Sequence, residues 1–123
     1  MFPDQMTAIE IASPGAADQL RQTTRPVPVP CHDQILIKVA YAGVNRPDVL
    51  QRAGSYAPPP GASDLPGLEA SGEIVGMGAG VTRWKKGEQV CALVPGGGYA
   101  EYVVCHADHA LRIPRGLTLR EGA

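Results

Sequence analysis

The segment Cys105-His106-Ala107-Asp108-His109 holds the densest group of side chains that could do chemistry. Thiolate, imidazole and carboxylate are the ligands that zinc prefers in proteins. Neighbouring residues of a strand, however, point to opposite faces of the sheet, so these side chains are expected to diverge. We interpret the segment as a solvated strand end, with a metal site as the less favoured alternative.

Two glycine-rich segments could bind a nucleotide phosphate. Gly76-Met77-Gly78-Ala79-Gly80 begins like a dinucleotide fingerprint, but Arg83 stands where the third glycine is needed and no helix pattern follows. Gly96-Gly97-Gly98 also lacks a following helix whose N-terminus could face a phosphate. The sequence therefore predicts a hairpin turn at the first segment and a bend before a strand at the second.

The elements that position these residues are predicted to be short strands. The chain has 123 residues, of which 15 are Gly and 12 are Pro, and both residue types favour tight turns. Apolar and β-branched runs predict strands at 6–11, 20–24, 35–42, 73–77, 89–94, 99–104 and 111–114. The nearly continuous run at 35–42 predicts burial on both faces of that strand. Short strands with Gly-rich turns favour an all-β barrel or sandwich.

One internal helix is predicted over residues 45–53. Asn45 suits the N-cap, Pro47 falls in the first turn, and Gly54 ends the helix. The loop 56–67 follows and is stiffened by three prolines at 58–60.

A second helix is predicted to begin near the end of the sequence. Thr118 is its N-cap, and Glu121 three residues later completes a capping box. So short a helix is unstable alone because nucleation is costly. We therefore expect the natural chain to continue beyond Ala123.

The composition excludes several classes of protein. Hydrophobic residues make up 44% and charged residues 19%, which is typical of a soluble globular protein. A net charge of -1 lacks the basic stripe of nucleic-acid-binding domains. No apolar run reaches the ~20 residues that span a bilayer, and no signal peptide is recognisable. We expect a cytoplasmic protein that contacts neither nucleic acid nor membrane.

The motifs Gly43-Val44-Asn45-Arg46-Pro47-Asp48 and Gly67-Leu68-Glu69-Ala70-Ser71-Gly72-Glu73-Ile74-Val75-Gly76 lie about twenty residues apart. Together with segments 51–56, 58–63, 95–102 and 113–117, they resemble the N-terminal GroES-like catalytic domain of the medium-chain dehydrogenase/reductase superfamily. The zinc-independent NADPH:quinone oxidoreductase branch is the most similar. The resemblance covers about residues 6–123. It implies a mainly β fold, a GroES-like partly open β-barrel with one or two short helices, over a single domain at 1–123.

The resemblance also bears on the metal. Zinc-dependent alcohol dehydrogenases of the superfamily have Cys at the position of Asn45 and His at the position of Leu68. An amide is a poor zinc ligand and an alkyl group is none, which leaves Glu69 alone. Because a catalytic zinc site needs three protein ligands, we expect no metal.

The resemblance implies roles for four residues. Asn45 and Arg46 would bind the NADPH cofactor, with Asn45 beside the nicotinamide ribose and Arg46 toward the phosphates. Tyr56 would face the substrate and donate a hydrogen bond to a quinone carbonyl, and Leu68 would line the substrate site. Purely structural roles remain open for Asn45, as a helix cap, and for Tyr56, as a cover of apolar surface. Arg46 is also a possible partner for the carboxylate of Glu69.

The implied reaction is hydride transfer from NADPH to a quinone or conjugated carbonyl. A Rossmann domain is expected after Ala123, so the isolated chain should be inactive, and the full-length protein is expected to be a homo-oligomer. One alternative is an enoyl-thioester or alkenal reductase of the same superfamily. Another is a free-standing GroES-like binding module, which a stop codon directly after Ala123 would favour.

Overall fold

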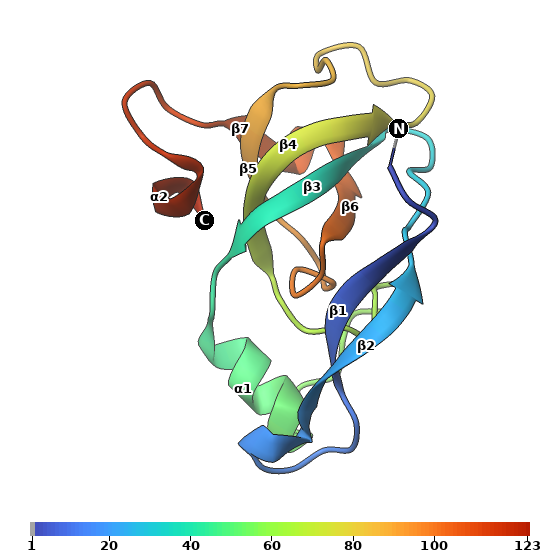
Figure 1. The fold of residues 1–123 in the computed structure, drawn as a ribbon, viewed down its shortest axis with the longest axis vertical. Helices are drawn as coiled ribbons and strands as arrows, with labels where there is room; N and C mark the ends of the chain where they lie inside the picture. Colours follow the sequence, from blue (N-terminus) through green and yellow to red (C-terminus); the bar gives the residue numbers. More distant parts are fainter. Residues whose placement is uncertain (1) are drawn as a thin grey trace.

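A computed structural model describes residues 2–123. Two of its strands form a hairpin, and five form one antiparallel sheet in the order β6-β3-β4-β5-β7 (Figure 1). The elements are β1 (Gln5–Ile11), β2 (Leu20–Pro26), β3 (Gln34–Ala42), α1 (Arg46–Ala53), β4 (Glu69–Met77), β5 (Gln89–Leu93), β6 (Tyr102–His106), β7 (Ala110–Arg112) and α2 (Leu119–Gly122). Single 3₁₀ turns, η1 (Ala17–Gln19) and η2 (Ala107–His109), complete the chain. The mainly β fold with short helices confirms the fold class expected from the sequence.

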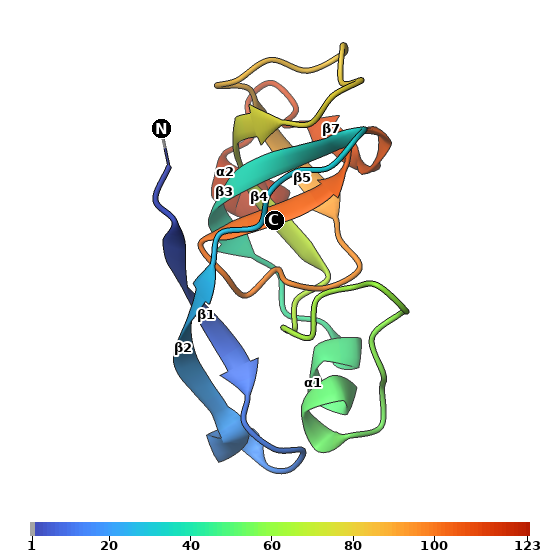
Figure 2. The same cartoon turned by 90° about the vertical axis from the view of Figure 1, so that its right-hand side faces the viewer.

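The central strand β3 separates two hydrophobic clusters. Ile35 and Ile37 pack into one cluster with Trp84, whereas Leu36 packs into the other with Tyr102. Successive residues of a strand point to opposite faces, so both faces of this half of β3 are buried. The second cluster fills the space beneath the β1–β2 hairpin, which stands beside the sheet (Figure 2). The predicted burial on both faces is thus confirmed for the start of β3, while its end is largely exposed.

Two strand boundaries predicted from the sequence are wrong. β4 begins at Glu69 and not at 73, because small residues with little strand propensity start it. Gly72 lies so close to the carbonyl oxygen of Lys38 on β3 that a Cβ atom would overlap it. β6 spans 102–106 and not 99–104, since the backbone N–H of Tyr99 donates to the carbonyl of Pro66 and the loop pairs there instead.

A third boundary was predicted too early. β2 continues through Pro26, which lies opposite Gln5 in the last pair of the hairpin. Proline is tolerated there because the ladder ends at this pair. The remaining strands agree with the predictions to within two residues.

Both predicted helices are present. Asn45 is the N-cap of α1 with extended backbone angles, and Gly54 ends the helix in the left-handed region at φ +92°. At α2, the Thr118 hydroxyl accepts a hydrogen bond from the N–H of Glu121, as a capping box requires. The hydroxyl of Ser71 on β4 donates to the carbonyl of Leu119, which holds α2 against the sheet. The longest helix among residues 2–123 is α1 with eight residues, which is too short to cross a bilayer.

Candidate functional site

One end of the sheet brings the two sequence motifs together. There the end of β3 meets the start of β4, with Ala42 opposite Ala70, and the N–H of Gly43 donates to the carbonyl of Glu69 at 3.2 Å. The segment that connects β3 to α1 (Figure 1) begins at this end of the sheet. Asn45 therefore lies beside Leu68, although the two residues are far apart in the sequence.

The carboxylate of Asp48 connects three segments at this end of the sheet. Its Oδ2 accepts hydrogen bonds from the N–H of Asn45 at 2.9 Å and from the hydroxyl of Tyr99 at 2.8 Å. Its Oδ1 accepts from the N–H of Gly67 at 3.2 Å. Asp48 is only 5% exposed, so these bonds replace the water that a carboxylate otherwise needs. The geometry joins the helix start, the beginning of β4 and the loop before β6.

Asp48 lies beside a helix N-terminus and a phenol that donates to it. Asp48 stands in the first turn of α1, where the helix dipole stabilises an anion. Burial of Tyr99, together with its hydrogen bond to Asp48, raises the pKa of the phenol above its usual range. Tyr99 therefore remains a proton donor to the carboxylate at any pH near neutrality.

A local contact of Asp48 at the helix start could be expected from the sequence and is confirmed, but its contacts with Gly67 and Tyr99 were not predicted. The spacing Asn-x-x-Asp at a helix start, a variant of the capping box, was a usable signal for the contact between Asp48 and Asn45. The contact with Tyr99 crosses 51 residues and leaves no local pattern.

The structure brings together three of the four predicted site residues. Asn45 and Leu68 are half-buried, and Arg46 is exposed beside them. Tyr56 is half-buried but lies beyond the other end of α1, whose eight residues span about 12 Å. No hydrogen bond or ion pair among the described residues joins the Tyr56 side chain to the other three, so its place at the site rests on the resemblance.

The expected ion pair between Arg46 and Glu69 is absent from the described residues. The carboxylate of Glu69 instead lies directly over Gly43, in the space that a Cβ atom would fill. The missing side chain at position 43 therefore makes room for Glu69 at the edge of the site.

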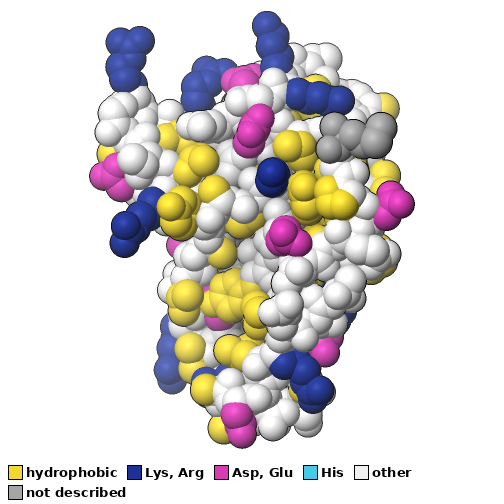
Figure 3. Space-filling view, in the orientation of Figure 1, with side chains coloured by type: hydrophobic (Ala, Val, Ile, Leu, Met, Phe, Trp, Pro, Cys, Tyr) yellow, Lys and Arg dark blue, Asp and Glu magenta, His cyan; other side chains and the backbone are white. Residues whose placement is uncertain are grey.

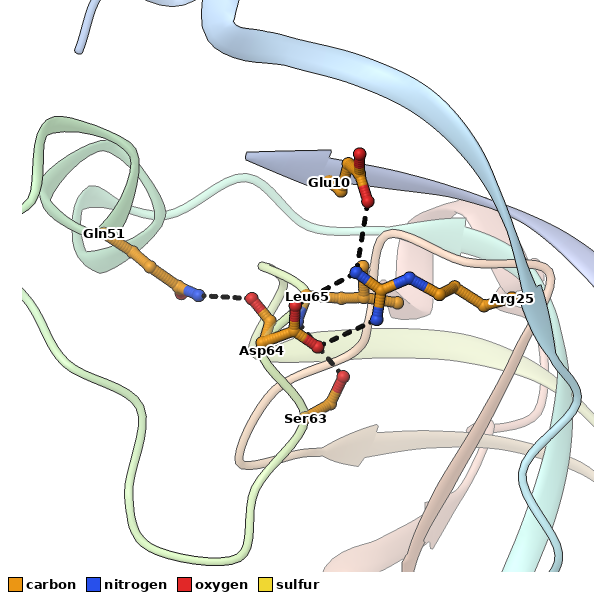
Figure 4. Close-up of polar contacts among 6 residues, drawn as sticks. All are labelled: Glu10, Arg25, Gln51, Ser63, Asp64 and Leu65. Atoms are coloured by element: carbon orange, nitrogen blue, oxygen red, sulfur yellow. Dashed lines mark hydrogen bonds and ion pairs between the residues drawn. The ribbon is translucent and has the colours of Figure 1, made fainter. Parts of the chain in front are cut away.

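The loop that carries Tyr56 is held by a polar cluster at its other end (Figure 4). Arg25 of β2 donates to both carboxylate oxygens of Asp64, at 2.9 and 3.0 Å, and to Glu10 of β1 at 3.1 Å. The side chain of Gln51 on α1 donates to the carbonyl of Asp64 at 3.1 Å. Arg25 lowers the pKa of Asp64 by hydrogen bonding to its carboxylate. The hairpin, α1 and the loop are therefore connected through one residue.

The segment 105–109 does not assemble a metal site. β6 ends at His106 and η2 follows, so the alternation expected for a strand separates only Cys105, which is buried, from His106, which is exposed. Burial raises the pKa of the Cys105 thiol to about 12. Within residues 2–123 no three His, Cys, Asp or Glu side chains come close enough to hold a metal ion.

The glycine-rich segments form turns and loops, except that Gly76 and Met77, predicted to lie in a turn, are the last residues of β4. Gly78 and Gly80 lie in the connection from β4 to β5, and Gly96–Gly98 lie in the loop before β6. Among the described residues the element that comes next after each segment is a strand and not a helix, β5 after the first and β6 after the second. These segments offer no helix N-terminus to a nucleotide phosphate.

A cavity of about 630 Å³ lies between the β1–β2 hairpin and β6 and reaches Leu93 at the end of β5. Met6, Leu65, Tyr102 and Val104 are among the residues that line it, and none of the four predicted site residues does so. The predicted site residues lie at the end of the sheet and outside this cavity. Contacts from the sequence motifs, and not cavity size, therefore define the candidate site.

Apolar side chains surround the candidate site on the surface. Val44, which precedes Asn45, is 77% exposed, and Leu93, which pairs with Glu69 across β4 and β5, is 68% exposed. Figure 3 shows hydrophobic side chains scattered over the middle of one face, with Lys and Arg mainly at its top and lower edges. Val44 and Leu93 thus offer exposed apolar surface near Asn45 and Glu69.

Comparison of the sequence with known proteins identifies the family of this chain. Residues 31–115 match the family model of the alcohol dehydrogenase GroES-like domain. The chain belongs to this family. It is thereby a member of the medium-chain dehydrogenase/reductase superfamily, which confirms the resemblance drawn from the two motifs.

Named relatives and solved structures agree with the assignment to the GroES-like family. The quinone oxidoreductase of Lama guanicoe is 38% identical over 121 residues, which cover 96% of this chain and 36% of the relative. The structure of the quinone oxidoreductase from Coxiella burnetii superposes with a TM-score of 0.87 at 28% identity, over 97% of this chain and 40% of that one. The human synaptic vesicle membrane protein VAT-1 homolog-like protein gives a TM-score of 0.89 at 29% identity, over 96% and 38%. This GroES-like chain thus spans a little over a third of the length of these relatives.

Proposed function

We propose that this chain is the N-terminal catalytic domain of a zinc-independent, NADPH-dependent quinone oxidoreductase. The observation that carries the proposal is that Asp48 bonds both Asn45 and Gly67, the residue before Leu68, and so holds these two segments together at the end of the sheet. By resemblance, Asn45 and Leu68 are at the two positions where zinc-dependent members hold Cys and His. An amide and an alkyl group do not hold a catalytic zinc ion. Hydride transfer to a conjugated carbonyl, which needs no zinc, is therefore the reaction that we assign to these residues.

The residues at the start of α1 fit the nicotinamide end of the cofactor. The amide of Asn45 offers a donor and an acceptor without a charge, which suits a ribose. Arg46 is exposed and makes no ion pair among the described residues, so its guanidinium is free for a phosphate. When bound, NADPH supplies a hydride to the acceptor.

The remaining residues of the wall act on the acceptor. Leu68, Val44 and Leu93 exclude water from the face of a planar acceptor by covering it with apolar surface. The Tyr56 hydroxyl, at the far end of α1, donates a hydrogen bond to a carbonyl oxygen of the acceptor as negative charge develops there. The chain thus orients both reactants and stabilises the oxyanion.

A substrate panel with the full-length protein tests the reaction. We expect reduction of quinones with NADPH that persists after treatment with a strong chelator. Faster reduction of an enoyl thioester or an alkenal than of any quinone would contradict the proposal and assign the related reductase activity. A lack of reduction of every acceptor would favour a binding module.

Substitutions of Asn45 separate its two roles. Asn45→Ser keeps an oxygen for the helix cap but removes the amide, whereas Asn45→Ala removes both. Loss of one cofactor hydrogen bond predicts a decrease in kcat/KM for NADPH of up to about tenfold in both variants. If Asn45→Ser retains full activity and only Asn45→Ala loses it, Asn45 is a cap and not a cofactor ligand. Gln22→Ala, on the exposed face of β2, is the control.

A further inference from the structure

The carboxylate of Asp48 is the meeting point of the candidate site. Its three donors come from three segments that are remote in the sequence: the N–H of Asn45, the N–H of Gly67 and the hydroxyl of Tyr99. No side chain of the site itself bonds Asn45 to the segment of Leu68 within the described structure. Asp48 makes that connection.

The hydrogen bonds of Asp48 compensate for the burial of its carboxylate. None of the ion pairs among residues 2–123 includes Asp48, so no cation neutralises it. Hydrogen bonds to the charged form and the N-terminus of α1 stabilise the carboxylate instead. Hydrogen bonds to a charged group are short and strong, so the positions of all three donors are closely fixed.

Each carboxylate oxygen fixes one side of the site. Oδ2 sets the backbone of Asn45 and Oδ1 sets the backbone of Gly67, which precedes Leu68. Tyr99 holds the carboxylate from a third direction, and its own N–H is fixed by the carbonyl of Pro66 at 3.0 Å. The separation of Asn45 from Leu68 therefore depends on Asp48 and Tyr99.

We propose that Asp48, supported by Tyr99, is the positioning residue that sets the cofactor-binding amide of Asn45 against the substrate-facing side chain of Leu68. The proposal rests on the function proposed above. Asp48 touches neither reactant and acts through the two residues that do. A shift of about 1 Å between reactants can cost about 100-fold in rate, so a residue that sets this distance has a large effect on kcat.

Two variants of the full-length protein test the proposal. Asp48→Asn keeps the shape of the side chain. Its NH₂ group, however, must face at least one of the groups that donate to the carboxylate in the wild-type protein. Tyr99→Phe removes one of the three bonds and leaves the charge. We expect kcat with a quinone to fall about 100-fold in Asp48→Asn and about tenfold in Tyr99→Phe.

Trp84→Phe is the matched control, because the Trp84 indole N–H makes one buried hydrogen bond, to the carbonyl of Ala107 at 2.8 Å, in the other hydrophobic cluster. It removes one buried side-chain bond, as Tyr99→Phe does. A merely structural role for Asp48 and Tyr99 predicts that all three variants lose kcat in proportion to their loss of stability. The positioning role predicts a kcat within twofold of wild type in Trp84→Phe alone.

A double-mutant cycle identifies the residue through which Asp48 acts. In an Asn45→Ala background, Asp48→Asn should lower kcat less than threefold further, because the group that it positions is gone. Multiplication of the two separate losses would overturn the proposal.

A readout without turnover distinguishes failure of this proposal from failure of the proposed function. We expect the NMR signals of the Asn45 side-chain amide and the Leu68 methyl groups to shift in Asp48→Asn and in Tyr99→Phe, and to stay in place in Trp84→Phe. Unshifted signals in a folded Tyr99→Phe protein would overturn the positioning role, whatever reaction the protein catalyses.

Discussion

At the scale of single residues, two glycines of the motifs differ in the atoms that a side chain at their position would meet. A Cβ atom at Gly72 would overlap the carbonyl oxygen of Lys38 on the adjacent strand, whereas at Gly43 the atoms that it would overlap most closely are the carboxylate and Cγ of the Glu69 side chain. Backbone of a paired strand cannot move without breaking the ladder, but a side-chain end can swing into water. We therefore expect Gly72→Ala to lower the free energy of unfolding by about 1–3 kcal/mol, and Gly43→Ala by clearly less.

Urea denaturation of both variants measures this difference. Equal losses would show that the Glu69 carboxylate is fixed at the site and not merely placed over Gly43. Gly61→Ala, where a Cβ atom meets open space but φ is +81°, gives the cost of left-handed backbone alone.

The residue scale also shows what the sequence could and could not predict. Asn45 as a helix cap and Leu68 as its neighbour across the site followed from local spacing and from the motifs. Asp48 and Tyr99 could not be paired in advance, because a hydrogen bond between distant residues depends on how the elements pack. Tyr56 is grouped with Asn45 by resemblance alone, because it follows the opposite end of α1 and no local pattern connects the two residues.

At the scale of elements, the hairpin controls the loop that carries Tyr56. Arg25 donates to both oxygens of Asp64 and to Glu10, a geometry that a lysine cannot reproduce with its single point charge. We expect Arg25→Lys to speed amide hydrogen exchange in the loop 55–65 several-fold, since local opening of the loop becomes easier. Exchange in the sheet should stay the same, because the salt bridges of Arg25 lie outside it.

Mass spectrometry of hydrogen exchange tests the hairpin contact, with Arg21→Lys on the exposed part of β2 as the control. Unchanged exchange in the loop would mean that the bond from Gln51 to Asp64 suffices to hold it.

The contribution of the Arg25–Asp64 contact to stability depends on pH with a defined sign. Because Arg25 lowers the pKa of Asp64, its contribution is present above pH 3.8 and is lost as the pH falls through the lower folded value.

Strand bounds could be predicted from the sequence where β-branched residues are dense, and not where small residues form the strand. β3 was found almost to the residue, while the start of β4 was missed at Ala70, Ser71 and Gly72. Small residues lack strand propensity of their own and are selected there by the close approach of β3. Packing between strands, which no local window contains, decided that boundary.

At the scale of the whole molecule, folding takes two weak acids, Cys105 and Tyr99, at least partly out of water. Cys105 lies in the cluster of Trp84, and burial raises the pKa of its thiol from 9.0 to about 12. Tyr99 has its pKa raised as well, by burial and by the carboxylate of Asp48. Above pH 9 the unfolded chain therefore loses a proton from Cys105 that the folded chain keeps, and the Tyr99 phenol adds the same effect above pH 10.

This difference in proton binding predicts a loss of stability in alkali. Because the folded state binds more protons between pH 9 and 12, the free energy of unfolding falls as the pH rises through this range. For the thiol alone, the slope approaches about 1.4 kcal/mol per pH unit at most. The contribution of Cys105 is fully present below pH 9.

Urea denaturation at pH 8, 9, 10 and 11 measures the alkaline loss of stability. In Cys105→Ala the decline with pH should be shallower than in wild type, even though the smaller side chain lowers stability at every pH. Cys31→Ala, which alters an exposed thiol, should follow the wild-type curve. Parallel curves for wild type and Cys105→Ala would mean that water reaches the thiol in the folded state. Alkaline unfolding would then begin with the Tyr99 phenol at the candidate site and not in the core of the sheet.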